Sequence, residues 1–289
     1  MILSTDRLKI TLAEPGVFPN TTCRFDRSGF ITSVILDGEL EFCTAEPDNL
    51  SHPSSGGAGL CSEFIAPQMC LEAAPDTYFP KPGIGLMKRK SRAPYCFYET
   101  YEVRPFPVTW DITGNSVMFC MDASAGPGYS WLQKRQITVE ENRLICRTTL
   151  HNTGNREIRA MEYCHNFLTI ERLPLGGGYH ISVPGIRPQD GPLPGTLKHQ
   201  GQGFTFSGYN PNSALYSIPE QDIVPCDIFS WEMTHVFSKA GIKVTEGFCP
   251  CKVDIWAVDH LISVEVFYPV CLLPGKEVTW ERSWEFYRR

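Results

Sequence analysis

The sequence has no long hydrophobic run, no excess of positive charge and almost no helical periodicity. No window approaches the roughly 18 uninterrupted apolar residues of a membrane-spanning helix, so no membrane segment is predicted. The formal net charge of −6 and the pI near 5.7 give no basic surface that would attract nucleic acid or anionic lipid. Small molecules or other proteins are therefore the expected partners, and neither nucleic acid nor a membrane is.

The sequence also lacks the signs of secretion and of metal binding. Asp6, Arg7 and Lys9 interrupt the start of the chain, where a secretion signal would have an apolar core. The 12 cysteines are scattered singly, many of them in strand-like runs, and behave as small hydrophobic residues rather than as a disulfide framework. The one close pair, Cys249-Pro250-Cys251, has no second Cys/His pair nearby and fits zinc spacing poorly. We expect a cytoplasmic protein without a structural metal.

Period-two alternation and short β-branched or aromatic runs recur along all 289 residues. The pattern predicts an all-β protein, with residues 1–289 forming a single large antiparallel β-sandwich. Strands are expected at 8–12, 22–26, 30–36, 99–104, 108–112, 116–121, 133–139, 143–151, 158–170, 179–183, 203–207, 214–218, 228–237, 242–246, 252–258, 261–267 and 277–287. Two Pro/Gly-rich regions, 44–97 and 172–202, interrupt the strands. Long irregular segments on a rigid sheet are frequent locations for binding sites.

The stretch EYCHNFLTI, residues 162–170, places a histidine in an apolar strand. Strand alternation puts Tyr163, His165 and Phe167 on one face. Aromatic rings beside a few hydrogen-bonding groups suit a sugar, whose C–H faces are apolar and whose hydroxyl edges are polar. The alternative is an aromatic core with one hydrogen-bonded imidazole.

A second strand, DHLISVEVF at 259–267, carries a carboxylate among apolar neighbours. Alternation places Asp259, Ser263 and Glu265 on one face together with Leu261 and Phe267. A position shielded from water would raise the pKa of Glu265 and make its carboxylate a better base. The alternative is a glutamate on a solvated face of the sheet.

From about residue 97 onward, the order of these elements resembles the aldose 1-epimerase (galactose mutarotase) superfamily. The similar part begins at YETYEVRPF, includes GYSWLQK and the HNTGN turn, and reaches the histidine strand that ends at residue 170. The C-terminal segment SVEVFYPVCLLPGKEVTWERSWEF resembles the family's catalytic glutamate strand, followed by its Pro-Gly turn and last strand. The resemblance implies a single large β-sandwich, sometimes called a supersandwich.

The resemblance also implies an isomerase that interconverts the anomers of a free sugar or sugar derivative. Glu265 would remove the proton of the anomeric hydroxyl while His165 protonates the ring oxygen. The ring would open and then close onto the other face of the carbonyl. Such proton transfers need positioned acid and base groups and no cofactor.

The sequence departs from the family's pattern in its sugar-binding residues. The family has a further histidine upstream of the strand equivalent to YEVRPF, where this chain reads PYCFYETYEV. His180, in GGGYHISV, is the candidate replacement, although that segment also fits an ordinary hairpin. In PGIGLMKRK, Arg89 is the candidate sugar-binding arginine and Lys88 its substitute, although a KRK run also fits a solvated surface. With Tyr163, Phe167 and Asp259, these residues form the expected substrate-binding set.

Two other functions remain open at this stage. The missing histidine permits a carbohydrate-binding protein of the same fold that does not turn over its ligand. Large β-sandwiches also carry sugar lyase and glycosidase-like sites, because a fold does not determine a function. The sequence identifies neither the sugar nor the oligomeric state, and a homodimer is left open.

Overall fold

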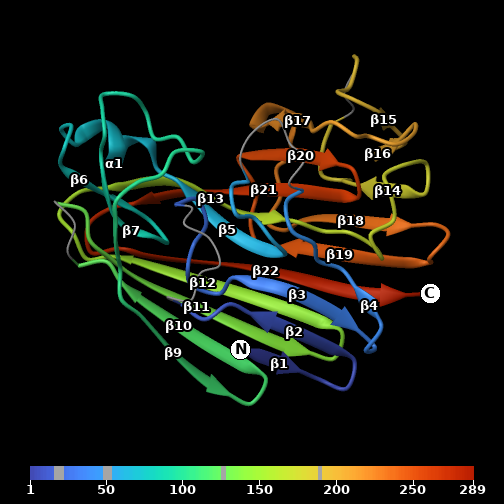
Figure 1. Cartoon of the computed structure of the whole chain (residues 1–289), viewed down its shortest axis with the longest axis horizontal. Helices are drawn as coiled ribbons and strands as arrows, with labels where there is room; N and C mark the ends of the chain where they lie inside the picture. The colour runs from blue at the N-terminus through green and yellow to red at the C-terminus, as the bar shows by residue number, and fades with distance from the viewer. Residues whose placement is uncertain (16–22, 48–53, 125–127, 188–190) are drawn as a thin grey trace.

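The computed structural model describes residues 1–15, 23–47, 54–124, 128–187 and 191–289. Nearly all of its regular structure is β-strand, arranged in two large antiparallel sheets and one small one (Figure 1). The first sheet contains, in spatial order, β1 (Ile2–Ser4), β2 (Leu8–Leu12), β3 (Ile31–Leu36), β5 (Leu60–Ile65), β13 (Ile158–Asn166), β21 (Leu261–Leu272), β20 (Lys252–Val258) and β17 (Ala214–Pro219), with β4 (Leu40–Glu41) paired to β3.

The second sheet is built almost entirely from the later part of the chain. Its strands are, in order, β15 (Leu197–His199), β16 (Gly203–Phe206), β14 (Tyr179–Ser182), β18 (Phe229–His235), β19 (Ala240–Glu246), β22 (Glu277–Arg288), β12 (Arg143–Asn152), β11 (Trp131–Glu140), β10 (Ser116–Asp122) and β9 (Val108–Thr113). The small sheet contains β6 (Tyr78–Lys81), β7 (Gly85–Lys88) and β8 (Val103–Pro105). The described residues also contain two short helices: α1 (Pro67–Glu72), with Pro67 at its first position, and a 3-10 turn at Glu220–Asp222.

The predicted all-β sandwich is confirmed, because most of the expected strands lie where alternation placed them. In β11, for example, every second side chain from Trp131 to Val139 is buried. Val139 and Trp131 are each 1% exposed, whereas Lys134 and Glu140 face solvent. A strand with one buried face is the case in which the period of two is most visible in a sequence.

The region 44–97 is not the irregular segment that its prolines and glycines suggested. It contains β5, which lies between β3 and β13 in the first sheet, as well as α1, β6 and β7. Five of the six residues of β5 are buried, so the strand shows no alternation by which it could be recognised. The strand expected at 22–26 does not form over 23–26, and residue 22 lies outside the described residues.

The core between the two large sheets is apolar but contains a buried ionic group. Glu162 of β13 accepts hydrogen bonds from Arg282 Nη1 at 2.6 Å and Trp280 Nε1 at 2.9 Å, both on β22 of the opposite sheet. Arg135 on β11 approaches the same carboxylate at 3.5 Å. The Glu162 side chain therefore points into the core. Because side chains alternate along a strand, Tyr163 and His165 point out of the sandwich.

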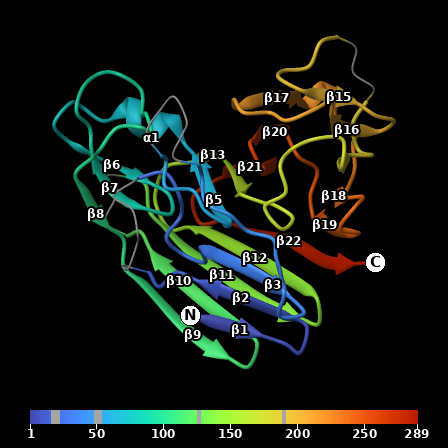
Figure 2. The same cartoon turned by 45° about the vertical axis from the view of Figure 1, so that its right-hand side comes forward.

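Figure 2 shows α1 with the small sheet on one side of the molecule and β15, β16, β18 and β19 on the other, with β13 and β21 between them. Over the described ranges, no helix is long and apolar enough to cross a bilayer. The outer face of the first sheet, onto which Tyr163 and His165 project, carries the candidate active site.

Candidate active site

The register of β13 and β21 brings His165 and Glu265 together. The two strands pair antiparallel from Ile158 opposite Leu272 to Glu162 opposite Tyr268. Extending that register by three residues places His165 across from Glu265. Their side chains meet, with His165 Nε2 at 3.2 Å from Glu265 Oε1. Two residues a hundred positions apart thus share one face, at a distance that allows a proton to pass between them.

Both groups are buried, and burial is the main reason why both favour the neutral form. The pKa of Glu265 is raised to about 8, mainly because the carboxyl is buried; the Arg24 charge opposes this increase, and the charge of Asp254 on the neighbouring strand contributes to it. Burial also lowers the pKa of His165 well below its usual value, and the nearby Arg24 guanidinium lowers it further. Around neutral pH the pair therefore contains a protonated carboxyl and a neutral imidazole. In that state, one mobile proton is shared between Oε1 and Nε2.

Aromatic rings fix the plane of the imidazole. Phe167 stacks on His165 with ring centroids 3.8 Å apart and planes 6° apart. Trp256 of β20 and Phe25 meet the imidazole edge-on, at 5.4 Å and 6.0 Å. Gly57 leaves room for Phe167, because a Cβ at residue 57 would lie 1.9 Å from the tip of that ring. His165 Nδ1 is buried and has no hydrogen-bond partner among the described residues.

Glu265 is positioned by the strands on either side of it. Ser263 Oγ donates to Glu265 Oε1 at 3.3 Å and accepts from the backbone N–H of Asn166 at 3.1 Å. Asp254 on β20 is the direct cross-strand partner of Glu265. Lys252 Nζ donates to Asp254 Oδ2 at 2.6 Å, while Asp254 Oδ1 is buried without a partner in the part of the chain that the structure describes.

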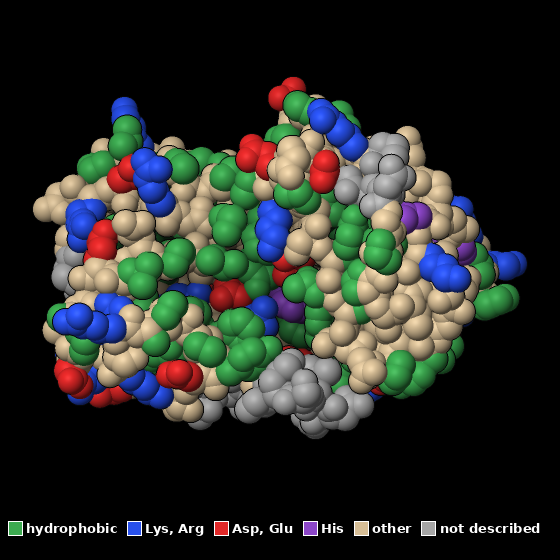
Figure 3. All heavy atoms as spheres, turned by 90° about the horizontal axis from the view of Figure 1, so that it is seen from above, with side chains coloured by type: hydrophobic (Ala, Val, Ile, Leu, Met, Phe, Trp, Pro, Cys, Tyr) green, Lys and Arg blue, Asp and Glu red, His purple; other side chains and the backbone are tan. Residues whose placement is uncertain are grey.

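The pair opens into a cavity of about 250 Å³. Polar groups on its lining include Arg24, Lys252 and Asp254, and aromatic groups include Phe97, Tyr163 and Trp256. Figure 3 shows this face hollowed at its centre, where acidic, basic and histidine side chains lie among hydrophobic ones. This mixture of ring faces and directional polar groups suits a small polar molecule with apolar C–H surfaces.

Arg24 connects the cavity to a buried network beneath it. Its guanidinium donates to Glu63 Oε2 at 2.8 Å, Tyr163 Oη at 2.9 Å and Ser55 Oγ at 2.9 Å. The same group lies over the ring of Phe97, 4.1 Å from its centroid. Arg24 is therefore held rigidly at the edge of the cavity, with its positive charge close to the acid–base pair.

The structure brings together four of the eight predicted site residues. His165, Glu265 and Tyr163 line the cavity, and Phe167 supports the imidazole from behind. The other four, Arg89, Lys88, His180 and Asp259, do not line it.

Each of these four has other partners. Arg89 is buried and donates to the backbone carbonyls of Leu71, Ala73 and Arg92, so it anchors a loop to α1. Lys88 lies 3.7 Å from Asp76 at the surface.

His180 belongs to the second sheet, where its Nδ1 contacts Gln200. Asp259 occupies the turn between β20 and β21 with φ of 57° and accepts from Tyr209 Oη at 2.5 Å. The sugar-binding roles expected for these four residues thus find no support in their positions.

Sequence reasoning missed the polar groups that surround the pair. A signal for Asp254 and Trp256 was present: the turn between 252–258 and 261–267 has only two residues, which fixes Asp254 opposite Glu265 and Trp256 opposite Ser263. Arg24 gave no signal, because it lies in a segment without strand structure and reaches the site only through the tertiary fold. Within the described ranges, no group of three or more His, Cys, Asp or Glu side chains could hold a metal ion.

Comparison with known proteins identifies the architecture. No protein-family model matches the chain, and no curated protein matches it in sequence. Among solved structures, a galactose mutarotase related enzyme from Lactobacillus acidophilus aligns over 99% of this chain and 97% of its own, with a TM-score of 0.59 and 11% identity.

Two further solved structures are described as galactose mutarotase-like proteins. The one from Clostridium acetobutylicum aligns over 100% of this chain and 95% of its own, with a TM-score of 0.58 and 10% identity. The one from Lactobacillus casei aligns over 99% of both chains, with a TM-score of 0.56 and 11% identity. The architecture of this chain is therefore the galactose mutarotase-like β-sandwich.

Proposed function

We propose that this protein is an aldose 1-epimerase-like isomerase that interconverts the anomers of a small sugar or sugar derivative. The observation that carries the proposal is the His165–Glu265 pair, 3.2 Å apart and opening into a cavity with aromatic and polar walls. Opening a hemiacetal ring needs one proton removed from the anomeric hydroxyl and one delivered to the ring oxygen. A buried acid–base pair provides both functions without a cofactor.

The protonation state of the pair suits this reaction. With one shared proton, the pair is either a carboxylic acid beside a neutral imidazole or a carboxylate beside an imidazolium. In the second form, the Glu265 carboxylate accepts the anomeric proton and the His165 imidazolium protonates the ring oxygen. The bond between C1 and the ring oxygen breaks and a carbonyl forms at C1. After rotation, the reverse transfers close the ring as the other anomer and restore the pair.

The surrounding side chains would bind and orient the sugar. The ring of Trp256 offers an apolar surface for C–H groups, while Arg24 and the unpartnered Oδ1 of Asp254 offer a donor and an acceptor for hydroxyls. The positive charge of Arg24 would also stabilise negative charge on the substrate oxygen as its proton leaves. In this proposal, these groups take the sugar-binding roles that the sequence suggested for Arg89 and Lys88.

Polarimetry with pure α-anomers of several aldoses tests the proposal. The wild type should accelerate the approach to the anomeric equilibrium, and Glu265→Gln or His165→Asn should reduce kcat by about 10²- to 10⁴-fold. His180→Asn, which removes an imidazole from the second sheet, is the matched control and should retain activity. If the wild type binds a sugar without accelerating mutarotation, the isomerase proposal is refuted. Release of a new reducing end or of an unsaturated product would indicate a glycosidase or a lyase instead.

A further inference from the structure

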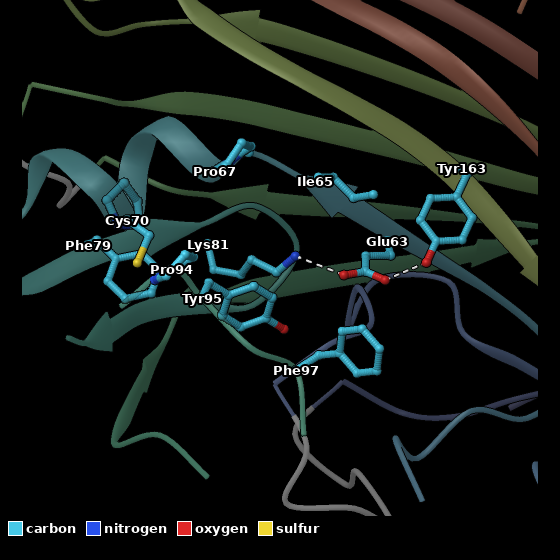
Figure 4. A pocket seen from close by; sticks show the side chains of 12 residues that line it. Glu63, Ile65, Pro67, Cys70, Phe79, Lys81, Pro94, Tyr95, Phe97 and Tyr163 are labelled. Carbon is cyan, nitrogen blue, oxygen red and sulfur yellow. Dashed lines mark hydrogen bonds and ion pairs between the residues drawn. The ribbon is translucent and has the colours of Figure 1, made fainter. Parts of the chain in front are cut away.

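A second cavity of about 240 Å³ adjoins the first (Figure 4). The two cavities are both lined by the side chains of Ile65, Phe97 and Tyr163, which form the wall between them. The second cavity is therefore adjacent to the cavity into which the His165–Glu265 pair opens. The two cavities can be regarded as adjacent compartments of one site.

The second cavity is lined largely by apolar groups. Pro67, Phe79, Pro94 and Tyr95 contribute to its lining, together with the shared wall. Figure 4 shows Ile65 and Pro67 on one side and Tyr95 and Phe97 on the other. Such a lining favours an aromatic or aliphatic group over a hydrated sugar ring.

The charged side chains at this cavity are already paired with one another. Lys81 Nζ donates to Glu63 Oε1 at 3.3 Å and to the carbonyl of Phe64, and it lies 4.8 Å from the centroid of the Tyr95 ring. Glu63 accepts in addition from Tyr163 (Figure 4) and, outside the residues drawn there, from Arg24. A buried ammonium whose donors are satisfied in this way does not require an anionic ligand. The cavity therefore selects by apolar contact and not by charge.

We infer that the substrate is a sugar with an apolar aryl or alkyl substituent, which occupies this second cavity while the sugar ring occupies the first. The inference rests on the proposed function for the sugar ring. The substituent must be attached to an oxygen other than the anomeric one, because the reaction requires a free anomeric hydroxyl. Burial of a group the size of a phenyl ring between Pro67 and Tyr95 would tighten binding by about 10- to 100-fold.

Direct binding measurements test the inference separately from turnover. Isothermal titration calorimetry would compare D-galactose and D-glucose with their mono-O-benzyl ethers at C2, C3, C4 and C6. At least one ether should bind about 10- to 100-fold tighter than its parent sugar. Ala66→Phe, which adds a ring at a residue that lines the second cavity, should reduce that ratio toward one. Leu71→Phe is the matched control, because Leu71 lies on α1, the helix that begins directly after Ala66, but is 52% exposed and does not line the cavity; it should retain the wild-type ratio.

The outcomes separate this inference from the proposed function. If none of the benzyl ethers binds tighter than its parent sugar, the substituent site is refuted, whether or not free sugars mutarotate. If an ether binds tighter in a manner that Ala66→Phe abolishes but polarimetry detects no turnover, the substituent site is supported and the isomerase proposal fails. An affinity gain that both phenylalanine variants leave unchanged would place the substituent elsewhere and would overturn the inference.

Discussion

The imidazole of His165 lies flat against the ring of Phe167, with ring centroids 3.8 Å apart and planes 6° apart. Phe167 is fully buried, so it leaves the imidazole little freedom to rotate away from Glu265. The stack sets the direction in which Nε2 can deliver or accept a proton.

Phe167→Leu should reduce kcat for mutarotation by about 10- to 100-fold with a smaller change in KM, because a loosened imidazole spends less time aligned with the ring oxygen. Polarimetric kinetics would measure both constants. Phe42→Leu makes the same truncation at a fully buried ring that packs on Phe286, and it should cost stability without this loss of kcat. Equal effects of the two variants would mean that Phe167 only supports the core.

Activity should depend on pH in a bell shape set by the acid–base pair. Above about pH 8 Glu265 ionises while His165 is already neutral, so the pair lacks a proton to donate and the rate falls. Below the lowered pKa of His165 both groups are protonated, so the pair lacks a base and the rate falls again. The pH range of maximal rate should therefore extend below pH 6.5, the ordinary pKa of a histidine side chain. A profile of kcat/KM from pH 4 to 10 would test both limbs, and a rate that rises through pH 8 would contradict this assignment.

Arg24→Gln should move both limbs of that profile to higher pH. The guanidinium charge lowers the pKa of His165 and that of Glu265, so its removal raises both. Arg24→Lys, which retains the charge, should move the limbs less. Unchanged limbs in Arg24→Gln would show that the positive charge does not act on the pair.

Asp254→Asn should move the alkaline limb in the opposite direction. The Asp254 charge raises the pKa of Glu265, so the neutral amide of the same shape should lower it. The alkaline limb would then begin below about pH 8. Opposite shifts in Arg24→Gln and Asp254→Asn, measured in one buffer series, would identify Glu265 as the group that titrates on this limb. A shift in the same direction for both would exclude it.

Gly57→Ala should destabilise the protein by about 1–3 kcal/mol, because the added Cβ would collide with the buried ring of Phe167 and force it to move. Chemical denaturation would measure the free energy of unfolding. Gly208→Ala is the matched control: its added Cβ would meet no heavy atom within 4 Å, and it should change stability little. If Gly57→Ala leaves the free energy of unfolding unchanged, Phe167 can shift freely. That result would also weaken the prediction for Phe167→Leu.

The sequence predicted the strands, and the proximity of His165 and Glu265, more reliably than the other residues that line the cavity. Alternation located β11, which has one solvated face, and it placed Tyr163, His165 and Phe167 on a common face. It did not detect β5, which is buried on both faces and therefore shows no period. Local patterns are informative where one side of an element meets water.

The binding residues were harder to predict because they depend on contacts distant in sequence. Arg24 reaches Tyr163 across 139 residues, and no local pattern near Arg24 indicates that contact. Arg89 had the chemistry of a sugar-binding residue, but its guanidinium is occupied by backbone carbonyls. Charge and residue type alone cannot distinguish a ligand-binding guanidinium from one that closes a loop.

The hairpin of β20 and β21 also limits how this site can vary. Only Asp259 and His260 join the two strands, and β21 is fixed on its other edge by β13. If β20 slipped by one residue relative to β21, Asp254 and Trp256 would turn toward the sandwich interior, and Val253 and Ile255 would replace them on the cavity wall. Homologues that retain this chemistry should therefore tolerate substitutions in the two-residue turn far better than insertions or deletions of a single residue there.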